Sequence, residues 1–449
     1  MSNIVAFELG AVEALQSLAR SEPRETCASG FVAPAGLRNG ERRYVVRDLK
    51  PVTEAAYLAR GHDCASLAPS FCMDLANQAR AKGLGVLLAH THPGPVALQS
   101  FSTIDDQGEQ CLREYFGRRV PDQVHLSAML TQAGGRCREL GSKDLARVQL
   151  IGRDVRWLPS ESGQVDAPEA RFSRQVLAFG PAAQTVLATI RVAIIGLGGT
   201  GSIIANQLAH LGVTDYLLVD PDFVEETNLN RLLGATPCDV GTGKAALLGH
   251  QIQAISPKAK CEVVSADVVD NDVAARLLDT DFIFLCTDSH ASRAVVNQIA
   301  YQYLIPCIDM GVAIYTREGK VTHVVGRTQM LSTGLPCLLC AGWIDTNQVR
   351  LEMMGKDQRA RDPYFTGEGV PQPAVISLNG TMASVAITTF LSAVATFPSE
   401  ARMMLYDAMR GSMRPTVMAP HPECIVCSLS GALARGTTWS LPTRNHVIN

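Results

Sequence analysis

The sequence lacks three features that would identify a secreted, membrane-spanning or nucleic-acid-binding protein. Its first residues contain no charged leader followed by an apolar core, which a secretory signal requires. No apolar stretch approaches the roughly 20 residues of a membrane-spanning helix. Basic runs are missing too, and a formal net charge of −3 provides no positive field for nucleic acid. We therefore expect a cytoplasmic protein that binds neither nucleic acid nor membrane.

Charged residues are also scarce, at 18% of the 449 residues, whereas hydrophobic residues reach 47%. This is the composition of a packed globular protein rather than a disordered one. At roughly 150 residues per domain, the length predicts two or three domains. The 13 cysteines are an odd number in a large chain. Buried or metal-binding thiols in a reducing compartment therefore fit better than a disulfide framework.

The chain has no internal repeat or low-complexity tract, and its pattern changes once. Residues 1–148 read as short strands and helices. Residues 149–170 include the polar stretch RDVRWLPSESGQVDAPEA, which has the composition of a linker. From residue 171 to 449, apolar runs such as RVAIIGLG alternate with helical stretches such as SIIANQLAHLG. This alternation predicts βαβ units and a mostly parallel sheet, and the whole chain is expected to be α/β with two domains.

The first domain carries two histidines at the end of an apolar run. In GVLLAHTH, His90 and His92 occupy positions i and i+2, which point to the same face of a strand. The segment SFSTIDDQGEQCLREYF has helical spacing and places Ser102 and Asp105 in the first turn of a helix. Two histidines and one carboxylate are a ligand set of catalytic zinc, which keeps a fourth position for water and lowers the pKa of that water.

Two further residues would complete a hydrolytic site. Glu25, in RETCASGF, is the candidate for the base that takes a proton and passes it to the leaving amine. Ser102 would donate a hydrogen bond to the developing oxyanion. A structural alternative stays open, because Ser-x-x-Asp before a helix is close to a capping box and isolated histidines are more often structural than metal-binding.

The segment HTHPGPVALQSFSTIDD, with Glu25 upstream, resembles the signature of JAB/MPN (JAMM) zinc metallopeptidases. Those enzymes cut isopeptide or peptide bonds after ubiquitin-like proteins. The resemblance covers about the first third of the chain and implies a JAB/MPN-like α/β domain with His90, His92 and Asp105 as zinc ligands. The gap from His92 to Ser102 is longer than in the eukaryotic deubiquitinases and similar to bacterial members. In the doublet Asp105–Asp106, the first residue fits the signature better.

A glycine-rich turn opens the second domain. RVAIIGLGGTGS places Gly196, Gly198 and Gly201 after a strand and before a helix, where a phosphate can approach the helix N-terminus. Asp220, at the end of the next strand, suits a ribose hydroxyl. This pattern alone would equally describe an NAD-dependent oxidoreductase.

The residues after the turn resemble the activation domain of ThiF/MoeB-type and ubiquitin-activating enzymes, which adenylate the C-terminal glycine of ubiquitin-like or sulfur-carrier proteins. VDPDFVEETNLNRLLGATPCDVGTGKAALL is similar to the family's Asp-x-Asp…Asn-Leu-Asn-Arg…Lys run, with Leu232 in place of the usual Gln. FLCTDSHASRAVVNQ is similar to its Mg²⁺-binding segment, and RFSRQVLAFG to its leading motif. The resemblance implies that ATP and Mg²⁺ are bound by a set of eight residues: Arg174, Asp220, Asp222, Asn228, Asn230, Arg231, Lys244 and Asp288. Arg293 and Asn297 follow Asp288 in the same segment.

The chemistry of adenylation favours this interpretation over a dehydrogenase. Attack of a carboxylate on the α-phosphate needs cations around the triphosphate and a metal for the departing pyrophosphate. Arg231, Lys244 and a Mg²⁺ on Asp288 would supply them, and Arg174 would reach the phosphates across a dimer interface. Hydride transfer needs no such collection of charges.

Two Cys-x-x-Cys pairs lie far apart in the second domain, in PCLLC and ECIVC. Two such pairs typically form a structural Cys₄ zinc site, and the alternative is a redox dithiol. ThiF/MoeB-like enzymes carry such a zinc, so the expected ligands are Cys337, Cys340, Cys424 and Cys427. We expect the other cysteines of this domain (Cys238, Cys261, Cys286 and Cys307) to be buried small hydrophobic residues.

The stretch AGWIDTNQVRLEMMGKDQRARDPYFTGEGVPQPAV contains no cysteine, although many relatives hold the carrier there as a thioester. We therefore expect the acyl-adenylate to pass to another nucleophile. The alternative is an unusual nucleophile of this chain such as a hydroxyl, and nothing in the sequence selects one. The two resemblances share one substrate, a carrier with a C-terminal Gly-Gly supplied in trans. The hypothesis is a bifunctional enzyme that uses Zn²⁺ to cleave at the carrier C-terminus and ATP with Mg²⁺ to activate it. A homodimer is expected, and a conjugating or sulfur-donor protein is a further candidate partner. The alternatives are a non-catalytic or single-activity regulatory scaffold that binds the ubiquitin-like protein, and an NAD-dependent oxidoreductase with a metal-binding domain.

Overall fold

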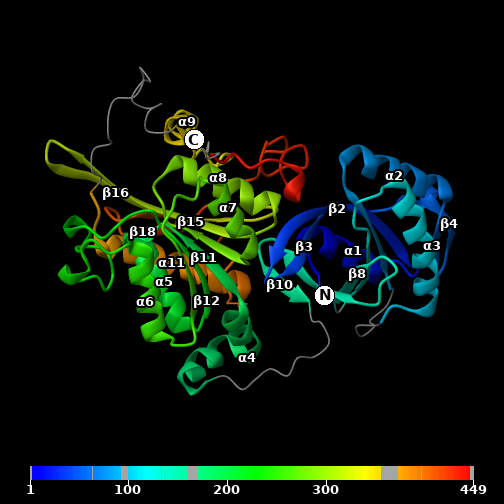
Figure 1. The fold of residues 1–449 in the computed structure, drawn as a ribbon, viewed down its shortest axis with the longest axis horizontal. Coiled ribbons are helices and arrows are strands. Elements are labelled where there is room, and N and C mark those ends of the chain that lie inside the picture. The colour runs from blue at the N-terminus through cyan, green and yellow to red at the C-terminus, as the bar shows by residue number, and fades with distance from the viewer. Residues whose placement is uncertain are drawn as a thin grey trace. The chain divides into compact units, whose positions relative to one another are not determined.

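The computed structural model describes residues 3–62, 64–92, 100–132, 134–158, 169–354, 373–395 and 397–444. The chain forms two compact units, each with its own sheet and helices (Figure 1). Unit 1 comprises residues 1–164, 302–304 and 428–440, and unit 2 comprises residues 165–301, 305–427 and 441–449. The main division, after residue 164, falls inside the segment 149–170 that was predicted as a linker.

Unit 1 is built on an eight-stranded sheet in the order β1-β3-β2-β6-β7-β8-β9-β10. Strand β1 pairs in parallel with both β3 and β9, so the sheet closes on itself into a barrel-like layer. The strands are β1 (Ile4–Glu8), β2 (Thr26–Arg38), β3 (Glu41–Pro51), β6 (Gly85–Thr91), β7 (Leu126–Thr131), β8 (Gly134–Glu139), β9 (Leu145–Ile151) and β10 (Val155–Leu158). A separate pair is β4 (Tyr57–Arg60) with β5 (Ala65–Leu67).

Three helices accompany this sheet, α1 (Leu9–Ser21), α2 (Pro69–Lys82) and α3 (Thr103–Arg119), with the short 3₁₀ helix η1 (Glu54–Ala56). Apolar residues of α1 recur with helical spacing at Leu9, Val12 and Leu15, and this face packs into the core beside Phe7. Residues 85–89 of β6 form a continuous apolar run and are all buried. This pattern fits a central strand that is covered on both faces.

The predicted linker overlaps the sheet of unit 1 at its start. β9 continues to Ile151, and β10 pairs antiparallel with it, Val155 opposite Ile151. Val155 is buried. The segment was predicted as a linker because the stretch DVRWL is short and the residues around it are polar. Residues 159–168 of the predicted linker lie outside the described residues.

Unit 2 contains an eight-stranded sheet in the order β13-β12-β11-β14-β15-β16-β17-β18. β13, β12, β11, β14 and β15 run parallel, and β15 to β18 continue antiparallel. The predicted α/β fold is therefore confirmed for the first five of these strands, and the whole sheet is mixed. The strands are β11 (Arg191–Ile195), β12 (Asp215–Val219), β13 (Lys260–Val264), β14 (Phe282–Leu285), β15 (Cys307–Arg317), β16 (Lys320–Leu331), β17 (Met403–Asp407) and β18 (Ser412–Pro415).

The helices of unit 2 include the crossover elements between the parallel strands. They are α4 (Ser173–Thr189), α5 (Gly199–Leu211), α6 (Lys244–Ile255), α7 (Asn271–Arg276), α8 (His290–Gln302), α9 (Thr346–Met353) and α11 (Ile376–Val394). The 3₁₀ helices are η2 (Ala170–Phe172), η3 (Glu226–Asn228), η4 (Pro237–Asp239), η5 (Leu277–Asp279) and, in unit 1, η6 (Gly436–Thr438). Strand order reverses between β11 and β14, and in such sheets ligands bind at the carboxyl ends of the strands at this switch point.

Helix α11 departs from the expectation that no segment is long and apolar enough to cross a membrane. Among the described residues it is the one helix that passes this test, by length and composition only. Half of its apolar window is buried, and it packs against α5, β15 and β16. The buried face, which includes Met382, Ala386 and Phe390, is that of a core helix.

Residues 428–440 belong to unit 1 although they come late in the sequence. The buried guanidinium of Arg47, on β3, donates to the backbone carbonyls of Leu429 and Leu433. Gly436, with φ +50°, packs so closely on β2 that an added Cβ would lie 2.1 Å from the Pro34 carbonyl oxygen. The Gln302 amide, at the end of α8, donates to the carbonyls of Gly436 (2.7 Å) and Trp439 (2.6 Å).

Candidate functional sites

The histidine pair of unit 1 lies where β6 ends. His90 is on β6 opposite Cys27 of β2, and His92 follows the strand by one residue. Their Nε2 atoms are 3.1 Å apart, so both rings face the same point, as the i, i+2 spacing predicted. Residues 93–99, the segment after His92, lie outside the described residues.

Helix α3 brings a carboxylate to the histidines. Ser102 is its N-cap, and the backbone N–H and hydroxyl of Ser102 donate to Asp105 Oδ2 at 2.7 and 2.8 Å. The other carboxylate oxygen, Oδ1, lies 3.6 Å from His90 Nε2. A capping box and a metal site are thus compatible, since each uses a different oxygen of Asp105. The oxyanion role of Ser102 stays a prediction, because its hydroxyl donates to Asp105 here.

These three side chains fit a zinc ion in spacing, and His90 fits it in protonation as well. Their candidate ligand atoms all lie within 4.8 Å of one another. Two nitrogens bound tetrahedrally to zinc would be about 3.3 Å apart, close to the distance between the two histidine Nε2 atoms. Burial lowers the pKa of His90 from 6.5 to about 4, so its imidazole is neutral at pH 7 and can ligate a metal.

Glu25 is buried just before β2, beside His92. Its carboxylate Oε1 lies 4.0 Å from His92 Nδ1, which is too long for a direct hydrogen bond. This position, on the Nδ1 side of the ring, suits a carboxylate that orients a metal-bound histidine, and the role of Glu25 as the base stays a prediction.

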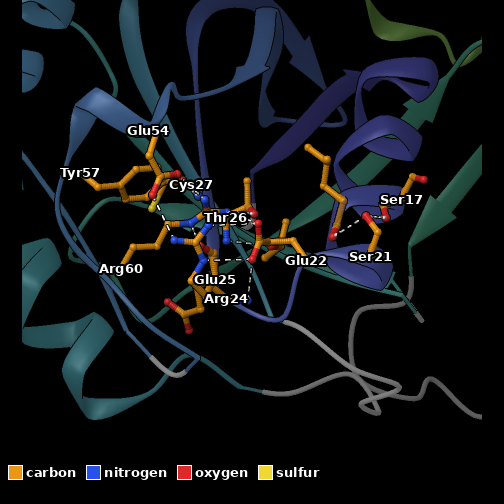
Figure 2. Close-up of polar contacts among 12 residues, drawn as sticks. Ser17, Ser21, Glu22, Arg24, Glu25, Thr26, Cys27, Glu54, Tyr57 and Arg60 are labelled. Atoms are coloured by element: carbon orange, nitrogen blue, oxygen red, sulfur yellow. Dashed lines mark hydrogen bonds and ion pairs between the residues drawn. The ribbon is translucent and has the colours of Figure 1, made fainter.

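Arg60, at the end of β4, holds the backbone around Glu25 (Figure 2). Its Nε donates to the Glu25 carbonyl at 2.7 Å, and its Nη2 donates to Thr26 Oγ1 at 2.7 Å. Its Nη1 pairs with Glu54 at 2.8 Å. Sequence inspection missed Arg60, because 35 residues separate it from Glu25 and no motif links them.

The glycine-rich turn of unit 2 connects β11 to α5. Gly196 has φ +84°, and an added Cβ would meet Cys286 backbone atoms at 2.9 Å. A Cβ on Gly201 would lie 2.0 Å from the Gly196 carbonyl oxygen, whereas the space beside Gly198 is open to 4 Å. The first and third glycines thus close the turn, and Gly198 leaves room for a ligand at the start of α5, as a bound phosphate requires.

Two aspartates follow β12 and hold the turn from the other side. Asp220 is buried and accepts the N–H groups of Leu197 (2.5 Å) and Asp222 (2.8 Å). Burial raises its pKa, although both hydrogen bonds oppose this shift. Asp222 pairs with Lys244 Nζ at 2.8 Å, and Lys244 is the first residue of α6.

The Asn-Leu-Asn-Arg segment surrounds η3. Asn228 is buried and accepts the Glu225 N–H through its side chain, whereas Asn230 is exposed and bonds Arg231 Nη1 at 3.2 Å. Arg231 also donates to the Thr227 carbonyl at 2.7 Å and lies beside Gly199. Leu232, the departure from the family pattern, is buried in a small core with Val224 and Leu247.

Asp288 follows β14 and is exposed, two residues before the start of α8. Arg293 holds this segment by donating to the carbonyls of Thr287 (2.9 Å) and Asp288 (3.3 Å) and by pairing with buried Asp309 at 3.1 Å. Asp309 also pairs with Arg327. Sequence inspection missed this second ion pair.

The remaining motif residues have structural or unassigned surroundings. Asn297 is buried and accepts the Leu338 N–H at 2.9 Å, next to the first cysteine pair. Arg174 is exposed on α4, and the described residues supply no ion-pair partner for it, so its action across a dimer interface stays a prediction.

The two cysteine pairs meet although 87 residues separate them. Sγ atoms are 3.6 Å apart between Cys337 and Cys424, and again between Cys340 and Cys427. All four lie within 4.8 Å, close to the about 3.8 Å expected for sulfurs bound tetrahedrally to zinc and too far for disulfides. A hydrogen bond from Cys427 lowers the pKa of Cys337 to about 5 and raises that of Cys427. Four thiols so close together can all ionise only around a cation.

The other cysteines of unit 2 differ from one another in exposure. Cys307 is buried as predicted, whereas Cys261 and Cys286 are half-buried. Cys238 is exposed, because it lies in η4 on the surface segment between Arg231 and α6, and the prediction that it is buried is wrong.

Comparison with known proteins assigns the second unit to a family. Residues 172–426 match the ThiF family. The chain is 26% identical over 265 residues to the SAMP-activating enzyme E1 of Haloferax volcanii, covering 58% of this chain and 89% of that protein. It is 27% identical over 264 residues to the molybdopterin-synthase adenylyltransferase of Escherichia coli, covering 58% and 97%.

A more distant relative is the ubiquitin-like modifier-activating enzyme 5 of Gallus gallus, 24% identical over 248 residues, which cover 53% of this chain and 58% of that protein. Among solved structures, E. coli MccB is similar with a TM-score of 0.45 and 18% identity, covering 60% of this chain and 75% of that chain. The family match includes more than half of the chain, from the start of α4 to the second cysteine pair. The chain therefore belongs to the ThiF family.

Proposed function

We propose that unit 2 adenylates the C-terminal glycine of a ubiquitin-like or sulfur-carrier protein, and that unit 1 is a zinc metallopeptidase of the JAB/MPN type that cleaves at the C-terminus of the same carrier. One observation carries the first activity. In a chain of the ThiF family, the glycine-rich turn, the Asp220–Asp222–Lys244 contacts and Arg231 come together around the start of α5.

In the proposed reaction, a carboxylate oxygen of the carrier's last glycine attacks the α-phosphorus of ATP, and the bond to the departing pyrophosphate breaks. Lys244 and Arg231 would neutralise the phosphate charge near the N-terminus of α5, and the open space at Gly198 would receive the phosphates. Asp220 would accept a ribose hydroxyl with its free lone pairs, and Asp222, Asn228 and Asn230 would complete the nucleotide site. Mg²⁺ held by Asp288 would add positive charge beside the pyrophosphate.

The acyl-adenylate is then expected to leave for a nucleophile outside this chain. Residues 341–375 contain no cysteine, so this segment offers no thiol for a thioester. A conjugating or sulfur-donor protein would supply the acceptor. The four cysteines of the two pairs fit a structural zinc, because their sulfurs face one another. Three of these sulfurs also accept a backbone N–H group, from Cys340, Val426 and His421.

The metallopeptidase proposal rests on the cluster of His90, His92 and Asp105 with Glu25 behind it. These three ligands would leave one position of a tetrahedral zinc open, and the ion would supply a Lewis acid that acidifies water and polarises the scissile carbonyl. Glu25 would take the proton and give it to the leaving amine, since its buried carboxylate is the nearest acidic group behind His92. Ser102 would turn its hydroxyl to the oxyanion.

Two assays separate the two activities. Carrier-dependent exchange of pyrophosphate with ATP should proceed with the whole protein and fall by roughly 1,000-fold in Arg231→Ala, the size of effect expected for losing a positioned cation. Arg317→Ala, at an exposed residue of the β15–β16 hairpin, is the control. Intact mass of a carrier extended past Gly-Gly should show loss of the extension with Zn²⁺ and gain of AMP with ATP. Unchanged exchange in Arg231→Ala would overturn the adenylation site, and retained cleavage in His92→Ala would overturn the peptidase site.

Homodimerisation, with Arg174 reaching the partner's nucleotide, and a cytoplasmic location complete the proposal. The dimer is testable by the mass of the protein in solution together with mixing of Arg174→Ala and Arg231→Ala chains, which should restore activity in one of two sites. A purely non-catalytic scaffold would bind the carrier and metal yet leave the carrier mass unchanged in both assays.

A further inference from the structure

One buried arginine beside the histidine cluster has no role in the proposed chemistry. Arg138 lies on β8, and only 5% of its side chain is exposed. An arginine stays charged at any physiological pH, so burying it is costly unless carboxylates surround it. The side chains that contact its guanidinium come from the first half of α3 and from the segment before it.

Two carboxylates of α3 bind this guanidinium. Nη1 pairs with Asp106 Oδ1 at 2.9 Å, and Nη2 pairs with Glu109 Oε1 at 2.9 Å. Nε also donates to Glu109 Oε1 at 3.2 Å. The second oxygen of Glu109 accepts the Gly141 N–H at 3.0 Å, just beyond β8. Arg138 and Glu109 therefore tie the first turns of α3 to the sheet.

The flat side of the same guanidinium covers Phe101. Arg138 Cζ lies 3.7 Å from the centre of the Phe101 ring, and this ring meets His90 edge-on with 6.3 Å between the ring centres. Phe101 directly precedes the N-cap Ser102. Arg138 thus contacts the residues on both sides of the capping box, and through Phe101 it reaches the first metal-ligating ring.

These contacts resolve the Asp105–Asp106 doublet. Adjacent residues on a helix point about 100° apart, so only one of the two carboxylates can face the histidines. Asp106 is turned to Arg138, and Asp105 Oδ1 is turned to His90. Without the guanidinium, the three carboxylates at positions 105, 106 and 109 would repel one another within the first two turns of α3, and the doublet would lose the contact that sets its rotation.

We propose that Arg138 is a positioning residue that fixes the rotation of the first turn of α3, so that Asp105 rather than Asp106 is presented to the metal. The inference deepens the proposed metallopeptidase function and rests on it, because it requires a metal at His90 and His92. Arg138 itself touches neither the metal ligands' coordinating atoms nor the space between them.

The test measures zinc affinity in the full-length protein by competition with a chromogenic chelator. Arg138→Met keeps the length of the side chain but removes its charge and its fork of donors. It should weaken zinc binding at the histidine site 10- to 100-fold, the usual effect of removing a partner that orients a metal ligand. Zinc at the cysteine cluster should stay bound. Arg118→Met, at an 81% exposed position of the last turn of α3, is the matched control and should bind zinc as the natural protein does.

A second variant guards against misfolding of Arg138→Met. Asp106→Asn, at a 41% exposed position, removes one ion pair of Arg138 while the Glu109 pair remains, and it should weaken zinc binding less, by a few-fold. Cobalt(II) placed at the histidine site reports ligand geometry directly. Its visible absorption bands should shift in Arg138→Met and in Asp106→Asn but not in Arg118→Met, an outcome that a general loss of stability would not produce.

The outcomes separate failure of this inference from failure of the proposed function. If His92→Ala weakens zinc binding whereas Arg138→Met and Asp106→Asn leave affinity and cobalt spectrum unchanged, the positioning role is wrong and the metal site stands. If the natural protein binds only one zinc, and His92→Ala leaves it in place, the metal site falls and the inference falls with it.

Discussion

The two groups of candidate metal ligands differ in how completely they enclose their centre. In unit 2, four sulfurs from two distant segments face one another, and backbone N–H groups fill the outer side of the cluster. In unit 1, three side chains meet at the end of one strand and the start of one helix, and a buried carboxylate stands behind them. A closed set of four ligands suits a structural metal, whereas three ligands leave a position for water.

The two clusters also differ in which parts of the protein hold their side chains in place. The cysteine cluster joins two segments 87 residues apart, and its four cysteines lie outside the helices and strands, so a metal there would organise these segments. The histidine cluster is held by β2, β6 and α3, which are already ordered by the core of unit 1. Metal loss should therefore unfold part of unit 2 but leave unit 1 folded and inactive.

The largest expected effect breaks the closed cluster. Cys424→Ser should release one zinc per chain and lower the melting temperature by more than about 10 °C, because bound structural zinc contributes its binding free energy to folding. Metal analysis and thermal unfolding followed by circular dichroism measure both changes. Cys238→Ser, at an exposed cysteine of the same unit, is the control. A melting temperature like that of the control would show that the cysteine cluster is not structural.

The next effect concerns the open cluster. His92→Ala should abolish carrier cleavage, by roughly 1,000-fold or more, because several kcal/mol of Lewis-acid stabilisation are lost. Its melting temperature should stay within about 3 °C of the natural value, since the ring is partly exposed and the strand ends before it. Cleavage assays by intact mass and thermal unfolding give both numbers. A large loss of stability here would remove the contrast between the two clusters.

A smaller effect is expected from the support behind Glu25. Arg60→Met should lower cleavage roughly 10- to 100-fold, because the backbone that carries Glu25 would shift by a fraction of an ångström to an ångström. Zinc content should not change, which distinguishes Arg60 from Arg138. Turnover at saturating carrier, compared with Arg118→Met, provides the measurement. Equal losses of zinc and of turnover would mean that Arg60 supports the metal ligands as well.

The smallest expected effect is a pH dependence of the stability of unit 1, caused by His125, a neighbour of the strand that carries His90. His125 is buried, accepts the Val86 N–H of β6 at 3.1 Å, and its pKa is lowered from 6.5 by burial. Below pH 6.5 His125 binds a proton in the unfolded chain but not in the folded state, where its pKa is lower. Unit 1 should therefore lose stability as the pH falls. His125→Asn keeps an acceptor and should flatten this dependence in zinc-loaded protein between pH 7 and pH 5. Identical melting curves against pH for both proteins would contradict it.

Local patterns in the sequence predicted the parts of both sites that lie on single elements. The histidine pair needs only the two-residue period of a strand, the glycine-rich turn needs only one β–α connection, and each cysteine pair is a three-residue spacing. The meeting of the two cysteine pairs was predicted from the presence of two such pairs in one domain, and the family resemblance supported it. The capping box and the predicted ligand Asp105 were two interpretations of one motif, and the geometry accommodates both because a carboxylate has two oxygens.

The supporting residues could not be predicted, because they depend on strand register. Arg60 reaches Glu25 across 35 residues, and Arg138 reaches Glu109 across 29. Neither belongs to a short motif, and an isolated arginine in a sequence is usually a solvated charge. For the same reason the predicted linker starts too early in the sequence, because β10 is recognisable as a strand only through its pairing with β9. Closure of the sheet by β1 and β9 likewise joins residues from both ends of unit 1.

The late return of residues 428–440 to unit 1 has a consequence for synthesis on the ribosome. Arg47 is made first, whereas Leu429 and Leu433, whose carbonyls accept from its guanidinium, follow 382 and 386 residues later. At the usual 5–20 residues per second, the intervening chain takes roughly 20 to 80 seconds to make. During that interval the Arg47 guanidinium lacks the two carbonyls that accept its hydrogen bonds in the folded protein. Unit 1 therefore cannot complete its folding until residues 428–440 have been made.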